Sequence, residues 1–373
     1  MKIYIIILLF VPLISCGQTD SIALIAKSKI NLKSENPVHS ILLYIEKPVK
    51  NYKYNKGFGS SDQPGQVVSK DSQFRIASST KLFVSIIILQ LIEEGKLSLN
   101  DKAFRYLKNF KFLDFENFHI FDGKKYSDVI TIKQLLSHRS GLSDIFSDKE
   151  QDFFSLLLKH PNKQYSPKSI VDLYYQYHLN ESPHFKPGKG WYYSDMNYVL
   201  LGLIIESIEQ KQLHESIRSR ILKPLKMNNT YFEFYEKAAH KRNRVNQYVG
   251  KINFSALNTS FDWAGGGLIS TNQDLSIFIK ALFDYKLINK KSLKKMIDVK
   301  RTKEGENRYG LGIYESEYNG NIFYGHYGFY GTYIGYCPEN NTIISYCITQ
   351  ATPDFNVYKF ICEVLNIQNK TSG

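Results

Sequence analysis

Hydrophobic residues follow two different periods along this chain of 373 residues. Two early stretches have the length and composition of strands: S-I-L-L-Y-I-E at 40–46 and N-Y-K-Y-N-K-G-F-G at 51–59. From about residue 78 to 240 the apolar positions follow helical spacing instead, in segments at 84–96, 132–138, 169–177 and 198–208. After about residue 307, strand patterns return at 309–315, 321–328, 331–336 and 342–348, and a helical pattern at 354–365 closes the chain.

Strand patterns at both ends, around a helical middle, predict one sheet assembled from the two termini, with a mainly helical lobe inserted between them. No internal repeat and no long linker divides the sequence. We therefore expect one domain over residues 39–367. Residues 17–38 are polar and form either a tether or a first helix, and residues 368–373 form a short C-terminal tail.

The first sixteen residues, M-K-I-Y-I-I-I-L-L-F-V-P-L-I-S-C, combine one basic residue, a mostly apolar run and a small residue near the end. This pattern is typical of a secretory signal peptide rather than of a membrane span. The stretch Leu13-Ile14-Ser15-Cys16 also resembles the bacterial lipoprotein cleavage box, in which the cysteine becomes the lipid-bearing first residue. We expect an exported protein of the bacterial cell envelope, attached to a membrane through Cys16. The alternative is an incidental cysteine in a cleaved peptide.

Composition and motifs exclude several functions. The formal net charge of +13 comes from lysines that are scattered among acids, without a basic repeat or a nucleic-acid motif, so nucleic acid is not an expected partner. Cys337, Cys347 and Cys362 are odd in number and form no C-x-x-C, so neither a disulfide framework nor a zinc cluster is indicated. No G-x-S-x-G or H-E-x-x-H occurs either. We expect no metal and no cofactor, and buried cysteines.

The spacing S-x-x-K occurs twice, at Ser78–Lys81 and Ser292–Lys295. Ser292 lies among lysines in N-K-K-S-L-K-K-M-I, where a cap on a surface helix explains it. Ser78 instead precedes V-S-I-I-I-L-Q-L-I, a helical run that is apolar on every face and must be buried. Burying Lys81 in the first turn of such a helix is costly unless the amine has a partner or a task. The first pair is therefore the candidate for chemistry.

The chemistry available to the first pair is nucleophilic. Residues three apart on a helix share one face, so Lys81 can reach the Ser78 hydroxyl. A desolvated lysine can lose its proton near neutrality and serve as a base. The start of the helix adds free amide donors and the positive end of the helix dipole, which suit a developing oxyanion. These groups suffice for a serine nucleophile.

Five segments together carry a family pattern, in the family's order and over nearly the whole mature chain. They are F-R-I-A-S-S-T-K-L-F (74–83), I-T-I-K-Q-L-L-S-H-R-S-G-L (130–142), W-Y-Y-S-D-M-N-Y-V-L-L-G-L-I-I-E (191–206), D-W-A-G-G-G-L-I-S-T (262–271) and Y-G-H-Y-G-F-Y-G-T-Y-I-G-Y (324–336). The pattern resembles the serine beta-lactamase and penicillin-binding-protein superfamily, in the branch of class C beta-lactamases, D-alanyl-D-alanine carboxypeptidases and related esterases. The resemblance implies a beta-lactamase/transpeptidase-like fold, α/β (α+β), with an antiparallel sheet flanked by helices.

By position in these motifs, the resemblance implies that Ser78 is the nucleophile, Lys81 its partner and Tyr193 a general base that later returns a proton to the leaving group. Tyr193 opens Y-S-D, and a reading as the S-D-N motif fails because Met196 stands at the asparagine position. Asp195 departs from the family's commoner asparagine, and its charge would hold Lys81 protonated. We therefore favour Tyr193 as the working base and Lys81 as a cation that lowers the pKa of the phenol. Asp195 also changes which substrate groups fit, because it accepts hydrogen bonds where an amide could donate.

His326-Tyr327-Gly328 matches the family's third motif, which is K-T-G in beta-lactamases and often H-x-G in this branch. The resemblance places His326 across the cleft from the serine. It also places the backbone N–H of Phe329 beside that of Ser78 as a second oxyanion donor. Gly328 would let the strand lie close to the substrate. Histidine in place of lysine removes a permanent charge that would bind a substrate carboxylate, so efficient beta-lactam turnover is not expected.

Two further glycine-containing motifs are expected to be structural. His138, Arg139 and Gly141, in S-H-R-S-G-L, fit a helix end with Gly141 as the left-handed cap. The run G-G-G at 265–267 lacks the context of a phosphate-binding loop.

The sequence thus predicts an exported serine hydrolase that forms an acyl-enzyme on Ser78 and acts on a D-amino-acid peptide or a related amide or ester. A carboxylic-ester hydrolase with the same residues is one alternative. A binding protein that acylates without turnover, or an inactive homologue, is the other. The expected partners are a small-molecule or peptide substrate and the membrane, and no oligomeric state is indicated.

Overall fold

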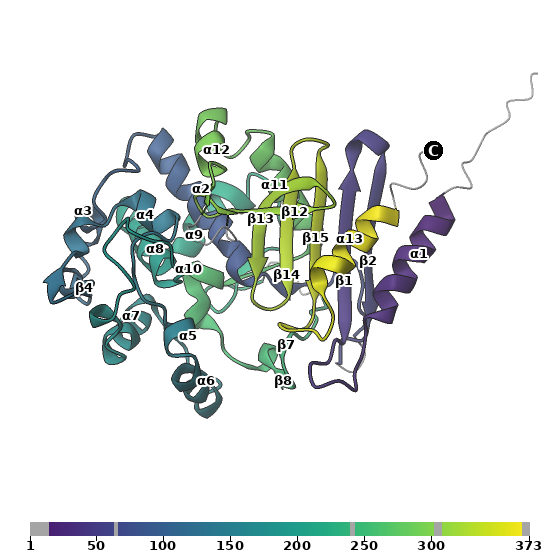
Figure 1. Cartoon of the computed structure of the whole chain (residues 1–373), viewed down its shortest axis with the longest axis horizontal. Helices are drawn as coiled ribbons and strands as arrows, with labels where there is room; N and C mark the ends of the chain where they lie inside the picture. Colours follow the sequence, from purple (N-terminus) through teal and green to yellow (C-terminus); the bar gives the residue numbers. More distant parts are fainter. Residues whose placement is uncertain (1–14, 63–65, 239–242, 302–307, 368–373) are drawn as a thin grey trace, which may run out of the picture.

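The computed structural model describes residues 15–62, 66–238, 243–301 and 308–367. Its largest element is an antiparallel sheet with the strand order β10-β11-β12-β13-β14-β15-β1-β2. Strand β1 (Ser40–Lys47) pairs with β15 (Thr342–Ile348), so the two ends of the sequence meet inside the sheet (Figure 1). This confirms the predicted sheet built from both termini.

Most other strands of this sheet follow the predicted pattern, but β10 was not predicted and one predicted strand is divided. These other strands are β2 (Tyr52–Gly59), β10 (Lys300–Arg301), β11 (Arg308–Tyr309), β12 (Tyr314–Tyr318), β13 (Asn321–Gly328) and β14 (Thr332–Cys337). The pattern predicts one strand over 309–315, and this is wrong, because the chain turns between β11 and β12. Gly312 has a φ of +78°, and a Cβ there would overlap the hydroxyl of Ser85 on a buried helix. The turn therefore requires a residue without a side chain.

Helices cover both faces of the sheet (Figure 1). They are α2 (Thr80–Glu93) and α11 (Asn272–Phe283) on one face, and α1 (Ser15–Ser28) and α13 (Val357–Ile367) on the other. Ile22 of α1 and Phe360 of α13 are buried in one apolar cluster with the outer face of the sheet. Residues 17–38 were expected to form either a tether or a first helix. The structure has the helix, which ends at Ser28 and contributes to the core.

The lobe between the two strand groups is mainly helical, as expected. Its helices are α3 (Phe104–Leu107), α4 (Ile132–Leu136), α5 (Ile145–Asp148), α6 (Glu150–Lys159), α7 (Pro167–Gln176), α8 (Met196–Glu209), α9 (Leu213–Ile217), α10 (Trp263–Gly266) and α12 (Lys290–Met296). Three short strands, β3 (Phe74–Arg75), β9 (Leu268–Ser270) and β6 (Tyr231–Phe232), form a second sheet. Two separate hairpins complete the lobe: β4 (Ile120–Phe121) pairs with β5 (Lys124–Lys125), and β7 (Tyr248–Val249) pairs with β8 (Ile252–Asn253).

Two helices in the middle of the core position the candidate site. Every residue of α2 from Thr80 to Leu89 is buried, and so is every residue of α8 from Met196 to Ile205. Such all-round burial is what the uniformly apolar run after Ser78 predicts. The N-terminal ends of the two helices lie together, because Lys81 in α2 and Asp195, which precedes α8, form an ion pair. The core therefore holds these ends in place.

Three other predictions can be compared with the structure. Ser292 is not the cap of α12; Asn289 is, because its side chain accepts the Ser292 amide hydrogen at 3.0 Å. Cys337 and Cys347 are buried, Cys362 is partly exposed, and all three are free thiols.

Most of the predicted signal peptide (1–14), the side chain of Cys16 and the tail 368–373 lie outside the described residues. Among the helices that the structure describes, none has the length and hydropathy to cross a membrane.

Candidate active site

Ser78 lies in a single 3₁₀ turn, Ala77–Ser79, between β3 and α2. Arg75 anchors the preceding strand, because its buried guanidinium donates to both carboxylate oxygens of Glu233, at 2.7 and 3.2 Å. Ala77 has a φ of +45°, a left-handed conformation that residues with a side chain rarely adopt. Backbone strain of this kind persists only where surrounding structure holds it, and it is frequent at functional sites.

Lys81 is completely buried and makes three polar contacts. Its Nζ lies 2.9 Å from Ser78 Oγ, 2.5 Å from Asp195 Oδ1 and 2.8 Å from the carbonyl oxygen of Gly265. A lysine ammonium has three hydrogens to donate and no acceptor, so the charged form satisfies all three contacts, and Asp195 balances its charge. A Cβ at Gly265 would overlap the Asp195 carboxylate, so this approach requires glycine.

Tyr193 completes the trio of predicted groups around the serine hydroxyl. The Lys81 ammonium lies 5.0 Å from the centre of the Tyr193 ring, and the phenol interacts with the Ser78 hydroxyl. Because the ammonium of Lys81 donates to Ser78 Oγ, the serine's own proton is free to point elsewhere. The structure therefore brings together the three residues that the motifs single out.

The protonation state of Tyr193 differs from the expectation. Desolvation by burial, the Asp195 carboxylate and the neighbouring Tyr314 raise the pKa of the phenol well above its ordinary value, and the interaction with Ser78 lowers it only in part. The expectation was a phenol with a lowered pKa. This is wrong, because the net shift of the Tyr193 pKa is upward. The resting phenol is protonated, so it can accept the serine proton only as it gives up its own.

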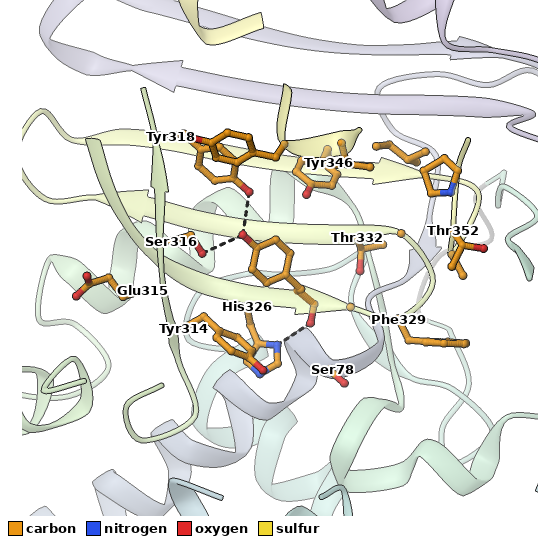
Figure 2. A pocket seen from close by; sticks show the side chains of 18 of the residues that line it. Ser78, Tyr314, Glu315, Ser316, Tyr318, His326, Phe329, Thr332, Tyr346 and Thr352 are labelled. Atoms are coloured by element: carbon orange, nitrogen blue, oxygen red, sulfur yellow. Dashed lines mark hydrogen bonds between the residues drawn. The ribbon is translucent and has the colours of Figure 1, made fainter. Parts of the chain in front are cut away.

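His326, on β13, uses both ring nitrogens and is almost completely buried. Its Nδ1 donates to the Tyr327 carbonyl at 2.6 Å (Figure 2). Its Nε2 therefore accepts the hydroxyl hydrogen of Tyr309 at 3.1 Å. Burial and the nearby Lys81 charge lower the pKa of His326 to about 3, so the ring is neutral. His326 and Ser78 line the same pocket, as the third motif implies. A neutral ring supplies no charge for a substrate carboxylate.

Gly328 and Phe329 follow His326 at the end of β13. A Cβ at Gly328 would overlap the carbonyl oxygen of Ile76 and the hydroxyl of Thr332. The glycine therefore serves the packing of β13 against the turn before Ser78, rather than the approach of a substrate. Within the described part of the chain, the amides of Ser78 and Phe329 are not used in backbone hydrogen bonds. Their role as oxyanion donors stays a prediction.

Two acidic residues to which the motifs assign no role lie beside these groups. Asp144 is buried and accepts the amide hydrogens of Asp195 and Ser147, at 2.7 and 3.1 Å. Asp262 accepts the hydroxyl hydrogen of Tyr330 at 2.8 Å. Burial is the main cause that raises the pKa of each aspartate to about 7. Among the described residues, neither carboxylate forms an ion pair, and the charges of Lys81 and, for Asp262, of Arg75 offset the effect of burial only in part.

His138 also has a place that the sequence did not predict. Its φ is +54°, and its amide and that of Arg139 donate to the carbonyls of Leu135 and Gln134 at the end of α4. His138, and not Gly141, is therefore the left-handed cap of this helix. Its ring lies 4.2 Å from the ring of Tyr193, so its role is not confined to the helix end.

Two cavities open on Ser78. The first, of about 860 Å³, runs from Ser78 past His326 and across β13 to tyrosines of the outer sheet face, including Tyr318 and Tyr346 (Figure 2). The second, of about 380 Å³, has aromatic walls and acidic side chains. Its phenylalanines are Phe146, Phe153, Phe154, Phe254, Phe261 and Phe329, and its aspartates are Asp144, Asp195 and Asp262. In the part of the chain that the structure describes, no group of His, Cys, Asp and Glu could hold a metal ion.

A sheet made from both termini, an inserted helical lobe and a buried Ser-x-x-Lys pair at the start of a central helix define the beta-lactamase/transpeptidase class of fold. A family model described as Beta-lactamase matches residues 50–360. The chain belongs to this family.

Three similar proteins illustrate the breadth of the family. Protein flp of Staphylococcus aureus is 36% identical over 205 residues, which cover 54% of this chain and 36% of flp, so the chain spans about a third of that relative. Teichoic acid D-alanine hydrolase of the same species is 27% identical over 267 residues, 70% of this chain and 59% of that protein. The D-amino acid amidase of Ochrobactrum anthropi SV3 superposes with a TM-score of 0.77 at 23% identity, covering 96% of this chain and 100% of that one.

Proposed function

We propose that this chain is a serine hydrolase that forms an acyl-enzyme on Ser78 and acts on D-aminoacyl amides, peptides or esters. The observation that carries the proposal is the 2.9 Å contact between Lys81 Nζ and Ser78 Oγ, at a point where two cavities meet. A lysine ammonium fixed on a serine oxygen stabilises negative charge there, which favours attack by that oxygen. The names of the D-amino acid amidase and the teichoic acid D-alanine hydrolase support a D-aminoacyl group.

In this proposal, each of these groups has a step in acyl transfer. Ser78 Oγ forms a bond to the substrate carbonyl carbon, and its proton passes to the Tyr193 oxygen while the phenol gives its own proton to the leaving nitrogen or oxygen. The bond to the leaving group then breaks, and water attacks the acyl-enzyme by the same route in reverse. Lys81 stays charged throughout, held by Asp195 and the Gly265 carbonyl. This relay needs no resting phenolate.

The second cavity favours an acyl group that carries a free amine. Asp144, Asp195 and Asp262 line it, and the only cation in contact with these three carboxylates in the described chain, Lys81, is already paired with Asp195. A substrate ammonium would complete this charge balance, whereas a substrate carboxylate would meet repulsion. The phenylalanine walls suit an apolar side chain. We therefore propose an N-terminal D-residue with an apolar side chain as the preferred acyl group.

Asp262→Asn tests this preference. The carboxylate of Asp262 has one oxygen held by Tyr330 and lines the cavity, so it can receive a substrate ammonium. We expect the variant to lose roughly 10- to 100-fold in kcat/KM for D-phenylalanine amide, because a hydrogen bond to a charged group is worth about 1.5–3 kcal/mol. The matched substrate without the amine, 3-phenylpropionamide, should change little. Equal losses of kcat/KM for both substrates would show that Asp262 does not bind the substrate amine.

The pH dependence of the same comparison follows from the raised pKa of about 7 for Asp262. The carboxylate is charged above that pH and neutral below it, so the preference for the amine-bearing substrate should grow as pH rises to about 7. It should fall again at higher pH, because the substrate ammonium, with a pKa of about 7.7–8.0, loses its proton. Steady-state kinetics of both substrates between pH 5.5 and roughly 8.5 measure this ratio. The Asp262→Asn variant retains the titrations of Asp144 and of the substrate amine, so its profile is the reference to subtract.

A substrate panel separates this proposal from the alternatives. Purified protein is incubated with D- and L-phenylalanine amide, a D-alanyl-D-alanine peptide, p-nitrophenyl acetate and a fluorescent beta-lactam. Turnover of the D-amide is the expected result. Turnover of the ester alone would support the carboxylic-ester hydrolase, and a stable beta-lactam adduct without turnover would support the acyl trap. An inactive homologue would react with none of them.

We also propose that the protein is exported and held at a membrane by a lipid on Cys16. The support is the sequence pattern of residues 1–16, with its lipoprotein-like L-I-S-C. In a bacterial host supplied with an alkyne fatty acid, the wild type should become labelled and partition into the membrane fraction. Cys16→Ala should lose the label and leave that fraction. Labelling of both proteins, or of neither, would contradict a lipid on Cys16.

A further inference from the structure

His138 holds the chain on both sides of Tyr193. Its carbonyl oxygen accepts the amide hydrogen of Tyr192 at 3.0 Å, and its ring Nδ1 accepts the amide hydrogen of Ser194 at 3.1 Å. One residue therefore fixes the backbone immediately before and immediately after the phenol. Asn197 adds a polar contact to the same nitrogen at 3.3 Å.

The ring of His138 also fixes the side chain of Tyr193. The two rings are stacked, with centroids 4.2 Å apart and an angle of 26° between their planes. Tyr309 closes the group, with its ring centroid 4.9 Å from that of His138 and 6.2 Å from that of Tyr193. Stacked aromatic pairs are worth about 0.5–1.5 kcal/mol beyond the area they bury. The phenol therefore loses the rotational freedom that an exposed tyrosine has.

The hydrogen bonds determine the chemical form of His138. Because Nδ1 accepts from an amide, it carries no proton, and a neutral ring has its hydrogen on Nε2. Burial, Lys81 and His326 lower the pKa of His138 well below its ordinary value, so the neutral form persists. Nε2 is buried, and no described residue accepts its hydrogen. If this position only filled space in the core, an apolar side chain would give a more stable protein, because it has no buried donor without an acceptor.

The backbone of His138 is a further cost. The residue is completely buried at a φ of +54°, a conformation in which glycine or asparagine is less strained. A helix cap alone would be served better by either of these residues. The strained backbone therefore indicates that the imidazole itself has a task, whereas a buried ring nitrogen without a partner is a cost that His138 shares with His119.

We propose that His138 is a positioning residue, which holds the Tyr193 phenol so that its oxygen reaches the Ser78 hydroxyl and the leaving group together. The inference rests on the proposed relay through Tyr193 and adds the residue that aligns it. A proton relay is sensitive to such alignment, since a misplacement of about 1 Å can cost roughly 100-fold in rate. His138 itself touches neither Ser78 nor the substrate in this scheme.

Two substitutions test the proposal. His138→Asn fits the left-handed backbone and keeps an acceptor for the Ser194 amide, but removes the stacked ring. His138→Gly fits the same backbone and removes both contacts. We expect the rate of acylation by a D-phenylalanine ester to fall roughly 10-fold for asparagine and up to roughly 100-fold for glycine, with KM within about threefold of wild type. Stopped-flow release of the leaving group measures both constants.

A matched control separates alignment from general damage to the core. His119 is also completely buried, contacts the carbonyl of Phe185 at 3.0 Å and packs edge-on against Tyr126. His119→Asn should lower the thermal unfolding temperature about as much as His138→Asn while leaving the acylation rate near that of wild type. Equal rate losses for the two variants would show that His138 matters only for stability.

A double-mutant cycle gives the decisive comparison. Once Tyr193→Phe has removed the relay, His138→Asn should cause almost no additional loss of acylation rate, because nothing remains to be aligned. Additive losses would overturn the positioning role even if the relay itself is correct. The proposed function fails separately, if wild-type protein does not acylate or if Tyr193→Phe acylates at the wild-type rate.

Discussion

Replacing Ser78 by alanine is expected to lower kcat/KM by at least roughly 10³-fold against every substrate that the wild type turns over, because no other group can form the acyl bond. The variant should remain folded. Ser78 lies in a turn whose geometry is set by Arg75 and Ala77, and its hydroxyl lies at the two cavities and accepts one hydrogen bond, from the Lys81 amine, which keeps its other two partners in the variant. Initial rates with D-phenylalanine amide and with p-nitrophenyl acetate measure the loss.

The second S-x-x-K pair supplies the control for this experiment. Ser292 has the same spacing to a lysine but lies within helix α12, where Asn289 provides the cap. Ser292→Ala should therefore retain wild-type activity. If Ser78→Ala kept the activity and Ser292→Ala lost it, the wrong serine would have been assigned.

Replacing Lys81 by methionine is expected to have the second largest effect, in two separable parts. Acylation should slow by roughly 10²- to 10⁴-fold, because the serine oxygen loses the cation that stabilises its charge. Stability should fall by about 3 kcal/mol, because the substitution leaves the Asp195 carboxylate without the partner that lies 2.5 Å from it. Kinetics and urea unfolding of one preparation measure both parts.

A compensating substitution distinguishes these two parts. In Lys81→Met with Asp195→Asn, the orphaned charge is gone, so most of the lost stability should return. The activity should not return, because the cation is still absent. Recovery of activity together with stability would mean that Lys81 acts only as a structural partner of Asp195.

The arrangement of the sheet could be predicted because strand and helix patterns are local properties of the sequence. The error at 309–315 shows the limit of this reasoning. A run of strand-like residues is interrupted at Gly312 because the turn packs against Ser85, more than two hundred residues earlier in the chain. No local pattern contains that contact.

The residues of the candidate site also differ in how far the sequence predicts them. Ser78, Lys81 and Tyr193 could be found because their motifs have recognisable spacing. The roles of His138, Asp144 and Asp262 could not be predicted, because they come from contacts with residues distant in sequence: Asp144 with Asp195, Asp262 with Tyr330 and His138 with Tyr193.

The sign of the Tyr193 pKa shift was missed for a related reason. Sequence indicates that a cation lies nearby, but not that burial, the Asp195 carboxylate and Tyr314 raise the pKa of the phenol.

The most direct test of the central claim is the mass of the covalent intermediate. Wild-type protein is mixed with a D-phenylalanine ester, quenched in acid during turnover, and analysed intact and after proteolysis. We predict an added D-phenylalanyl mass that maps to the peptide containing Ser78 and is absent from Ser78→Ala. Turnover without any adduct under conditions where acylation outpaces hydrolysis, or an adduct on another residue, would contradict an acyl-enzyme on Ser78.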